Sequence, residues 1–362
     1  MRLSHGIHLA YCTNIHRGGD WQETFQSLRE HTLRVRDRVS PDEPYAIGLR
    51  LGDTASRQLG QADELDAFRA WLEENRCYIF TVNGFPYGDF HGTRVKEDVY
   101  APDWTTPERV EYTKRLFDIL AAIAPADSGG SVSTVPCSYK EFITSGEQVA
   151  AMRRNLWEVV DYIDELSERT GKDLHLGVEP EPLCYLETSA EMVEFYRQMK
   201  ADRPGDERLT KRLGINYDTC HLAVEYEEAA EALGALVQEG IRISKLHFSS
   251  AMKVHPTRKC WLGWKRMRRI FISTKSSLEL RTEACGVIVI CRMRCAWLPK
   301  GKRRPIANGE FIFTCRFTVP RRNGSIRLPI NCRKRFNFSA ALRPFAPMSR
   351  WRHIRGRYCR MK

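Results

Sequence analysis

Five side chains that could hold or assist a divalent cation stand at the ends of three predicted strands. They are Glu179, Glu181, Asp218, His221 and His247. Carboxylate and imidazole groups together suit a cation such as Mn, Zn, Fe, Co or Mg, and they leave positions for substrate oxygens. Such a metal would polarise a carbonyl or hydroxyl group, while a nearby carboxylate, Glu179 or Glu181, moved a proton. The pattern predicts a metal-assisted reaction on a substrate that offers oxygen ligands.

Each of these residues has an ordinary structural role as its alternative. A lone Asp or His beside a loop is more often a helix cap or a solvated side chain than a ligand. Asp218 and His221 stand three positions apart where a predicted strand gives way to a helix. The metal interpretation is favoured because three successive strand ends carry such groups.

Loops at the same predicted end of the strands carry further polar side chains. Asn14, His16, Asn83 and His91 are candidate substrate-binding residues, with turn and capping roles as the alternative for each. The five cysteines in the first 252 residues show no CxxC spacing, so a structural zinc site is not predicted. We expect these thiols to be reduced.

Seven short β-rich runs alternate with segments of helical periodicity over the first 250 residues. The runs span residues 6–11, 45–51, 77–83, 130–136, 175–179, 213–218 and 241–248. Helices are predicted over 21–39, 63–75, 107–123 and 147–170, after a capping box at Thr188–Glu191, and in an Ala/Glu-rich segment ending near residue 238. This alternation is typical of consecutive right-handed β–α–β units.

Either a doubly wound sheet or a (β/α)₈ TIM barrel satisfies this alternation. A doubly wound sheet usually carries a Gly-rich phosphate turn, and no GxGxxG or GxxxxGK[ST] occurs here. Polar groups end nearly every run, and barrel sites are assembled from the carboxyl ends of many strands. The sequence therefore predicts an α/β TIM barrel.

Charge divides the chain into two unlike parts. Residues 253–362 hold 29 Lys+Arg and 3 Asp+Glu, which gives them a formal charge of +26 and leaves −14 on residues 1–252. No run of 18 apolar residues occurs, and the first residues lack a secretory pattern, so we expect a cytoplasmic protein without a transmembrane segment.

Long motifs in the first part resemble the xylose-isomerase-like TIM-barrel superfamily, and within it EboE, the metabolite-traffic proteins of the ebo cluster. The motifs are HLAYCTNIHRGGDW, TVNGFPYGDFHG, LGVEPEPLCYLET, GINYDTCHLAVEYE and KLHFSSA, spread over residues 1–257. The resemblance implies a metal held by Glu179 (with Glu181 as a competitor), Asp218, His221, His247 and a Glu on an eighth strand. It also implies a small polar metabolite as ligand and other ebo-cluster proteins as partners.

The basic part, residues 258–362, lacks the helical periodicity and acidic partners of residues 1–257. One interpretation is a basic arm for nucleic acid or anionic lipid. The other is that the segment is out of frame and poorly ordered. Read from the third base of each codon, residues 310–316 can encode Ile-His-Ile-His-Val-Pro, and residues 349–360 can encode an eighth strand, Met-Glu-Thr-Tyr-Thr-Trp-Glu-Val-Leu-Pro.

In the same frame residues 258–275 can encode an acidic amphipathic helix, and three such matches favour a slip of the reading frame near Thr257–Arg258. We then expect a barrel of about seven βα units that has lost its eighth strand and one metal-side carboxylate, and a chain that is poorly folded and inactive as written.

Three functions are compatible with these features to different degrees. The first is a metal-dependent barrel of the sugar isomerase or epimerase kind, and the second is a non-catalytic barrel that binds or passes on a metabolite. The third, an endonuclease-IV-like nuclease, is disfavoured because the charge of −14 on residues 1–252 would repel phosphate, so no nucleic-acid partner is expected.

Overall fold

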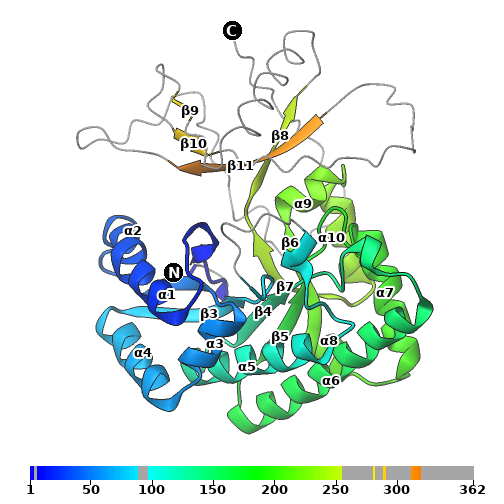
Figure 1. The fold of residues 1–362 in the computed structure, drawn as a ribbon, viewed down its shortest axis with the longest axis horizontal. Helices are drawn as coiled ribbons and strands as arrows, with labels where there is room; N and C mark the ends of the chain where they lie inside the picture. Colours follow the sequence, from blue (N-terminus) through cyan, green and yellow to red (C-terminus); the bar gives the residue numbers. More distant parts are fainter. Residues whose placement is uncertain (4–5, 89–96, 255–279, 282–287, 291–310, 319–362) are drawn as a thin grey trace. The chain divides into compact units, whose positions relative to one another are not determined.

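The computed structural model describes residues 1–3, 6–88, 97–254, 280–281, 288–290 and 311–318 (Figure 1). They belong to two units, of which the first contains residues 1–278 and 291–316. The expected domain boundary at residues 257–258 lies outside the described residues, as does most of the basic part.

Seven parallel strands form one curled sheet in the first unit, with each strand beside its neighbours in sequence. The strands are β1 (Ala10–Cys12), β2 (Tyr45–Arg50), β3 (Cys77–Asn83), β4 (Gly130–Thr134), β5 (Leu174–Val178), β6 (Leu213–Asp218) and β7 (Arg242–His247). Strands β4, β5 and β6 are buried along their whole length, whereas β1 and β7 are half-buried. Among the described strands none pairs with the outer edge of β1 or of β7, so the predicted barrel is confirmed in its incomplete form.

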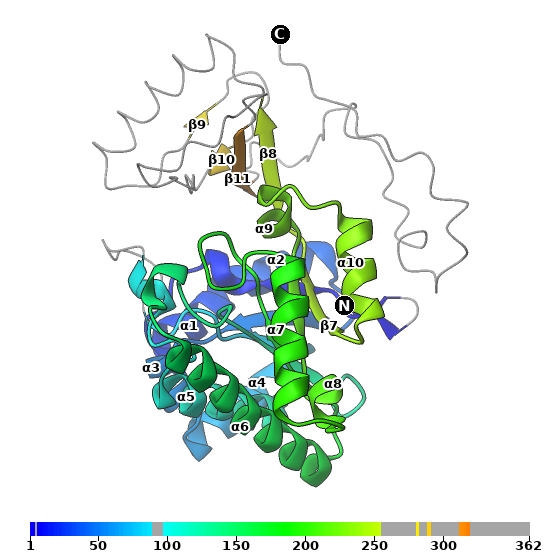
Figure 2. The same cartoon turned by 90° about the vertical axis from the view of Figure 1, so that its right-hand side faces the viewer.

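Helices cover the outer face of this sheet (Figure 2). They are α1 (Trp21–Ser27), α2 (Leu33–Val39), α3 (Asp53–Leu59), α4 (Ala62–Glu74), α5 (Pro107–Ile123), α6 (Gly146–Thr170), α7 (Ser189–Asp202), α8 (Arg208–Arg212), α9 (Thr219–Val224) and α10 (Ala229–Gln238). Short turns occur at η2 (Thr13–Ile15), η4 (Glu97–Tyr100) and η5 (Lys140–Phe142). In the described part of the chain no helix is long and apolar enough to cross a membrane.

Local chemistry sets the helix ends. Thr188 and Glu191 form the predicted capping box of α7, with the Thr188 side chain accepting from the Glu191 N–H. The segment predicted as one helix over 21–39 contains a π turn, η3 (Leu28–Thr32), between α1 and α2, which the Leu33 N–H closes onto the Leu28 carbonyl.

The first strand is shorter than the predicted run over 6–11. Gly6 has a φ of +71°, a left-handed conformation that interrupts an extended strand. The Leu3 N–H donates to the Ile7 carbonyl and the Leu9 N–H donates to the Met1 carbonyl, so this segment folds back on itself before β1 begins.

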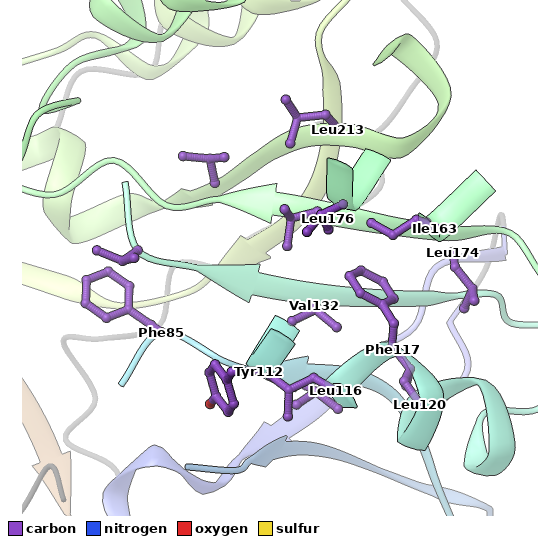
Figure 3. Packing of buried hydrophobic residues seen from close by; sticks show 14 of the residues in the cluster. Phe85, Tyr112, Leu116, Phe117, Leu120, Val132, Ile163, Leu174, Leu176 and Leu213 are labelled. Atoms are coloured by element: carbon purple, nitrogen blue, oxygen red, sulfur yellow. The ribbon is translucent and has the colours of Figure 1, made fainter. Parts of the chain in front are cut away.

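The apolar core lies between the strands and the helices (Figure 3). Val132, Leu174, Leu176 and Leu213 of the strands pack there with residues of α5 and α6, including Leu116, Phe117, Leu120 and Ile163. Because side chains alternate along a strand, the opposite face of the same strands lines the barrel interior.

The interior face is polar. Ser131 donates to the Thr81 hydroxyl over 2.9 Å, and Ser133, Asn83 and Asn216 are all buried. Barrel interiors are usually filled by Val, Ile and Leu. Polar side chains here make the interior suitable for a hydrophilic ligand.

Two further strand pairs are antiparallel and do not belong to this seven-stranded sheet. In the first unit, β8 (Ser250–Val254) pairs with β11 (Phe311–Thr318), with Phe313 opposite Met252. In the second unit, β9 (Leu280–Arg281) pairs with β10 (Ile288–Ile290).

Candidate metal centre

The carboxyl ends of β5, β6 and β7 place the predicted ligands beside one another. Glu179 follows the last residue of β5, Asp218 ends β6 and His247 ends β7. Asp218 and His247 are register partners, and the Glu179 N–H donates to the carbonyl of Thr134 at the end of β4. Parallel pairing in register therefore brings these side chains to one edge of the sheet.

Glu179 is buried and engages two neighbours through its two oxygens. Its Oε2 accepts from Asn216 Nδ2 over 2.7 Å, and its Oε1 lies 3.2 Å from His247 Nδ1. Asn216 is fully buried, and its Nδ2 also lies 3.2 Å from His247 Nδ1. The sequence prediction missed Asn216, although its position two residues before Asp218 places it on the same face of β6.

Asp218 uses its two carboxylate oxygens differently. Its Oδ1 accepts from the backbone N–H groups of Cys220 at 2.9 Å and His221 at 3.3 Å, and from the Ser249 hydroxyl. That oxygen therefore caps α9. Its Oδ2 faces the site, 3.6 Å from His247 Nδ1 and 3.9 Å from His221 Nε2. The capping role that the sequence left open is present, and one oxygen remains directed at the site.

The two histidines present different nitrogens to the carboxylates. His221 Nδ1 lies 3.1 Å from the carbonyl of Pro180, an acceptor that would fix Nδ1 as the protonated nitrogen and leave Nε2 a lone pair toward Asp218. His247 presents Nδ1, while its buried Nε2 has no hydrogen-bond partner among the described residues.

The donor set fits a divalent cation. One ligand atom each from Glu179, Asp218 and His247 lies within 4.8 Å of the others, and the same holds for Asp218, Cys220 and His221. Two carboxylates with imidazole nitrogens suit Mn, Fe, Co or Zn. Cys220 was not among the predicted ligands, and it is a buried free thiol beside the Asp218 cap.

The neighbouring histidines keep the two buried carboxylates, Glu179 and Asp218, ionised. Burial opposes ionisation of Glu179, but His247 and His221 outweigh it and lower the pKa of that carboxyl. The pKa of Asp218 is lowered in the same way by His221, His247 and Ser249. Burial and Lys245 lower the pKa of His247, yet Glu179 and Asp218 outweigh them and raise it. The carboxylates are thus in the protonation state that ligation requires.

Glu181 is buried but is not part of either converging group. Its backbone N–H donates to the Leu186 carbonyl, and its own carbonyl accepts from Cys184. The loop that follows β5 therefore fixes the backbone of Glu181 two residues beyond Glu179.

The predicted substrate-binding residues are distributed around the same end of the sheet. Asn83 is buried at the end of β3, where its Oδ1 accepts from the Phe85 N–H over 3.1 Å. Asn14 lies in η2, after β1. His16 forms a hydrogen bond with the Tyr11 hydroxyl over 3.0 Å and stacks on His31 at a centroid distance of 4.9 Å. It follows β1, whereas Glu179 follows β5. His91 lies outside the described residues.

A second interior residue escaped the sequence prediction. Lys245 stands two positions before His247 on β7, and its Nζ donates to Ser133 Oγ of β4 over 3.2 Å. Burial lowers the pKa of this ammonium group, while Cys12, Glu179 and Asp218 oppose the shift.

A cavity of about 420 Å³ lies elsewhere, where the strands begin, and its lining includes Lys172, Asp173, Arg212 and Arg242. These cations already have protein partners: Arg242 and Arg212 pair with Asp173, and Lys172 donates to the carbonyls of Ala121 and Ala124. The candidate ligands are at the opposite ends of the strands.

Seven consecutive parallel strands with helices outside them define an incomplete (β/α) barrel. No protein-family profile and no curated protein sequence matches the chain. Similar solved structures are xylose isomerase-like TIM-barrel proteins. One from Mycobacterium smegmatis, in complex with magnesium, is 13% identical with a TM-score of 0.48, and the match covers 71% of this chain and 79% of that one.

Two others are more distant in shape. The IolI protein with a bound zinc atom is 15% identical over 65% of this chain and 70% of its own, with a TM-score of 0.39. A xylose isomerase domain protein from Planctomyces limnophilus is 17% identical over 57% of this chain, with a TM-score of 0.38, and the match spans 64% of that protein's length. The fold class rests on the strand order and registers given above.

Proposed function

We propose that this chain is a divalent-metal-dependent barrel of the sugar isomerase or epimerase kind that acts on a small polar metabolite. The observation that carries the proposal is the convergence of Glu179, Asp218 and His247 from three neighbouring strand ends, with His221 beside them. The polar interior of the barrel below them supports a hydrophilic substrate.

The proposed ligands are Glu179, Asp218 through Oδ2, His247 through Nδ1, and His221 through Nε2. A bound divalent cation would polarise a carbonyl or hydroxyl oxygen of the substrate. Because Glu179 is assigned to the metal, we assign proton transfer to Glu181, the other carboxylate in the loop that follows β5. Asn216 and the Pro180 carbonyl orient Glu179 and His221 for ligation.

A barrel that binds or passes on a metabolite without chemistry is the alternative. It corresponds to the metabolite-traffic role of EboE, which the motifs around Glu179, Asp218 and His247 resemble. Both functions need the polar interior. A stoichiometric metal favours the enzyme, and the two functions differ in whether a substrate C–H bond is broken. A nuclease is less compatible with the charge of −14 on residues 1–252.

We also propose that the reading frame slips near Thr257–Arg258. The half-buried edges of β1 and β7 support this, because these are the two strands that an eighth parallel strand would join. In the intact frame that strand would bring a further carboxylate to the metal centre. One nucleotide inserted at this point in the gene would restore the frame.

Metal stoichiometry tests the proposed function. Purified protein, as the full chain and in the frame-restored form, is equilibrated with Mn²⁺, and bound metal is measured by mass spectrometry and calorimetry. We expect one Mn²⁺ per chain, lost in Asp218→Ala and retained in Asp66→Ala, a control whose carboxylate is 74% exposed on α4. A chain that binds no stoichiometric metal in either form would overturn the proposal.

Solvent exchange then separates the enzyme from the carrier. An isomerase or epimerase that works by proton transfer incorporates deuterium from D₂O at a substrate carbon. We expect such incorporation to depend on Glu181 and to vanish in Glu181→Gln without loss of Mn²⁺. Metal binding without any incorporation would favour the carrier.

A further inference from the structure

A lysine crosses the interior of the half-barrel beneath the candidate metal centre. Lys245 is the register partner of Asn216, and it shares the inward face of β7 with His247, two residues later. Its Nζ reaches Ser133 Oγ at 3.2 Å on β4, three strands away in the sheet. The ammonium group therefore lies within the barrel rather than on its surface.

The ammonium group has more donors than the surrounding protein satisfies. A lysine carries three N–H donors. Within the part of the chain that the structure describes, Ser133 Oγ is its one hydrogen-bond acceptor, and Lys245 makes no ion pair within 4.0 Å. Two donors of a partly buried cation thus remain for a ligand, and a buried donor without an acceptor is unfavourable.

The nearby carboxylates are committed to other contacts. Glu179 accepts from Asn216 and lies against His247, and Asp218 Oδ1 caps α9. Neutral polar groups surround Ser133 instead. Its register partner on β3 is Asn83, and two residues earlier on the same two strands Ser131 donates a hydrogen bond to Thr81. The lysine therefore lies beside a set of hydroxyl and amide groups. Arg50, the register partner of Asn83 on β2, is directed elsewhere and donates to the Gly18 carbonyl.

We propose that Lys245 binds a carboxylate group of the substrate, with Ser133 and Asn83 beside it, and that the metabolite is a polyhydroxy acid rather than a neutral sugar. This inference rests on the proposed function, because it concerns the substrate of the same site. Hydrogen bonds between an ammonium and a carboxylate are charge-assisted and about twice as strong as neutral ones. The hydroxyl and amide groups of the interior would accept and donate to the hydroxyls of such a molecule.

A matched pair of probes tests the proposal. Gluconate and sorbitol have the same number of carbons and differ at the carboxylate end. Each is titrated calorimetrically into the full chain, and into the frame-restored form, at saturating Mn²⁺. We expect gluconate to bind at least ~10-fold more tightly than sorbitol, the factor that one charged hydrogen bond supplies.

Variants assign this preference to the lysine. Lys245→Met should abolish the preference for gluconate while Mn²⁺ still binds, a result that also excludes simple chelation of the metal by gluconate. Lys211→Met, a control whose side chain is 57% exposed on α8, should retain the preference. If Lys245→Met does not fold, Lys245→Gln keeps a neutral donor at the same position and should lose the preference as well.

The outcomes separate this inference from the proposed function. Equal affinities for the two probes, or a gluconate preference that survives in both Lys245 variants, would overturn the inference, and bound Mn²⁺ in the same samples would leave the metal centre standing. A Lys245-dependent preference in protein that binds no Mn²⁺ would support the inference and contradict the metal proposal.

Discussion

Asn216 donates a hydrogen bond to Glu179 across two adjacent strands, with Nδ2 2.7 Å from Oε2. The same Nδ2 lies 3.2 Å from His247 Nδ1, so one fully buried amide contacts two of the proposed ligands. Outer residues of this kind fix the orientation of metal ligands, and their loss typically weakens metal binding by about 10–100-fold.

We therefore expect Asn216→Ala to lower Mn²⁺ affinity by about 10–100-fold while the fold is kept. Calorimetric titration of Mn²⁺ measures the change, and circular dichroism checks the fold. Asn75→Ala is the matched control, because that amide caps the end of α4, where its Nδ2 donates to the Trp71 carbonyl. Unchanged Mn²⁺ affinity in folded Asn216→Ala would show that Asn216 does not position the ligands.

Two substitutions at Asp218 separate its cap from its proposed ligation. Asp218→Asn keeps an oxygen for the N–H groups of Cys220 and His221 but removes the negative charge. We expect it to lose Mn²⁺ with little change in stability. Asp218→Ala should lose Mn²⁺ and also destabilise the fold by about 1 kcal/mol, because the helix cap is gone. Urea unfolding and metal titration on both variants measure the two effects, and full Mn²⁺ affinity in Asp218→Asn would contradict a charged ligand at this position.

His175 makes the fold sensitive to acid. It is buried in β5, and burial, aided by Arg242 and Arg212 and opposed by Asp173, lowers its pKa from 6.5 to about 3. The unfolded chain takes up a proton at His175 below about pH 6.5, whereas the folded chain stays neutral there until about pH 3. The contribution of neutral His175 to the free energy of unfolding is therefore complete above pH 6.5 and is lost as the pH falls toward 3.

From this difference we expect the free energy of unfolding to fall by about 2 kcal/mol between pH 7 and pH 5. Urea unfolding at the two pH values measures it. His175→Gln should remove most of this pH dependence, and His31→Gln, at an exposed histidine, should leave it intact. An equal pH dependence in both variants would assign the acid sensitivity to other groups.

Restoring the frame at codon 258 should protect the two outer strands. Amide hydrogen exchange of β1 and β7 in the chain as written should be much faster than that of β5, because one side of each outer strand lacks a pairing partner among the described residues. In the frame-restored form we expect slower exchange in both strands and a sharper thermal transition. Identical exchange in the two forms would argue against a missing eighth strand.

Much of the fold was predictable because its signals are local. The strand predicted over 213–218 coincides with β6, and the helix predicted over 107–123 coincides with α5. The strand predicted over 6–11 is shortened to β1 (Ala10–Cys12) because Gly6 takes a left-handed φ that composition does not reveal.

The candidate site was predictable where its residues end strands, as Asp218 and His247 do. Asn216 and Lys245 were missed because they lie inside strands, at positions that apolar residues usually fill in barrels. Cys220 was missed as a ligand because its convergence with His221 depends on the turn into α9, which spacing alone does not fix. Contacts between distant elements, such as Lys245 with Ser133, have no local signal at all.

The polar interior face of the sheet lowers the free-energy cost of leaving the barrel open to water. In a barrel whose interior is lined with Leu and Ile, a missing strand would expose apolar side chains to water and favour non-specific aggregation. Here the inner faces of β3, β4 and β6 present Thr81, Ser133 and Asn216, which water can solvate. The vulnerable feature is instead the backbone at the outer edges of β1 and β7, which have no pairing partner among the described strands. Molecules whose barrel does not close should therefore associate edge to edge as ordered sheets rather than as amorphous precipitate.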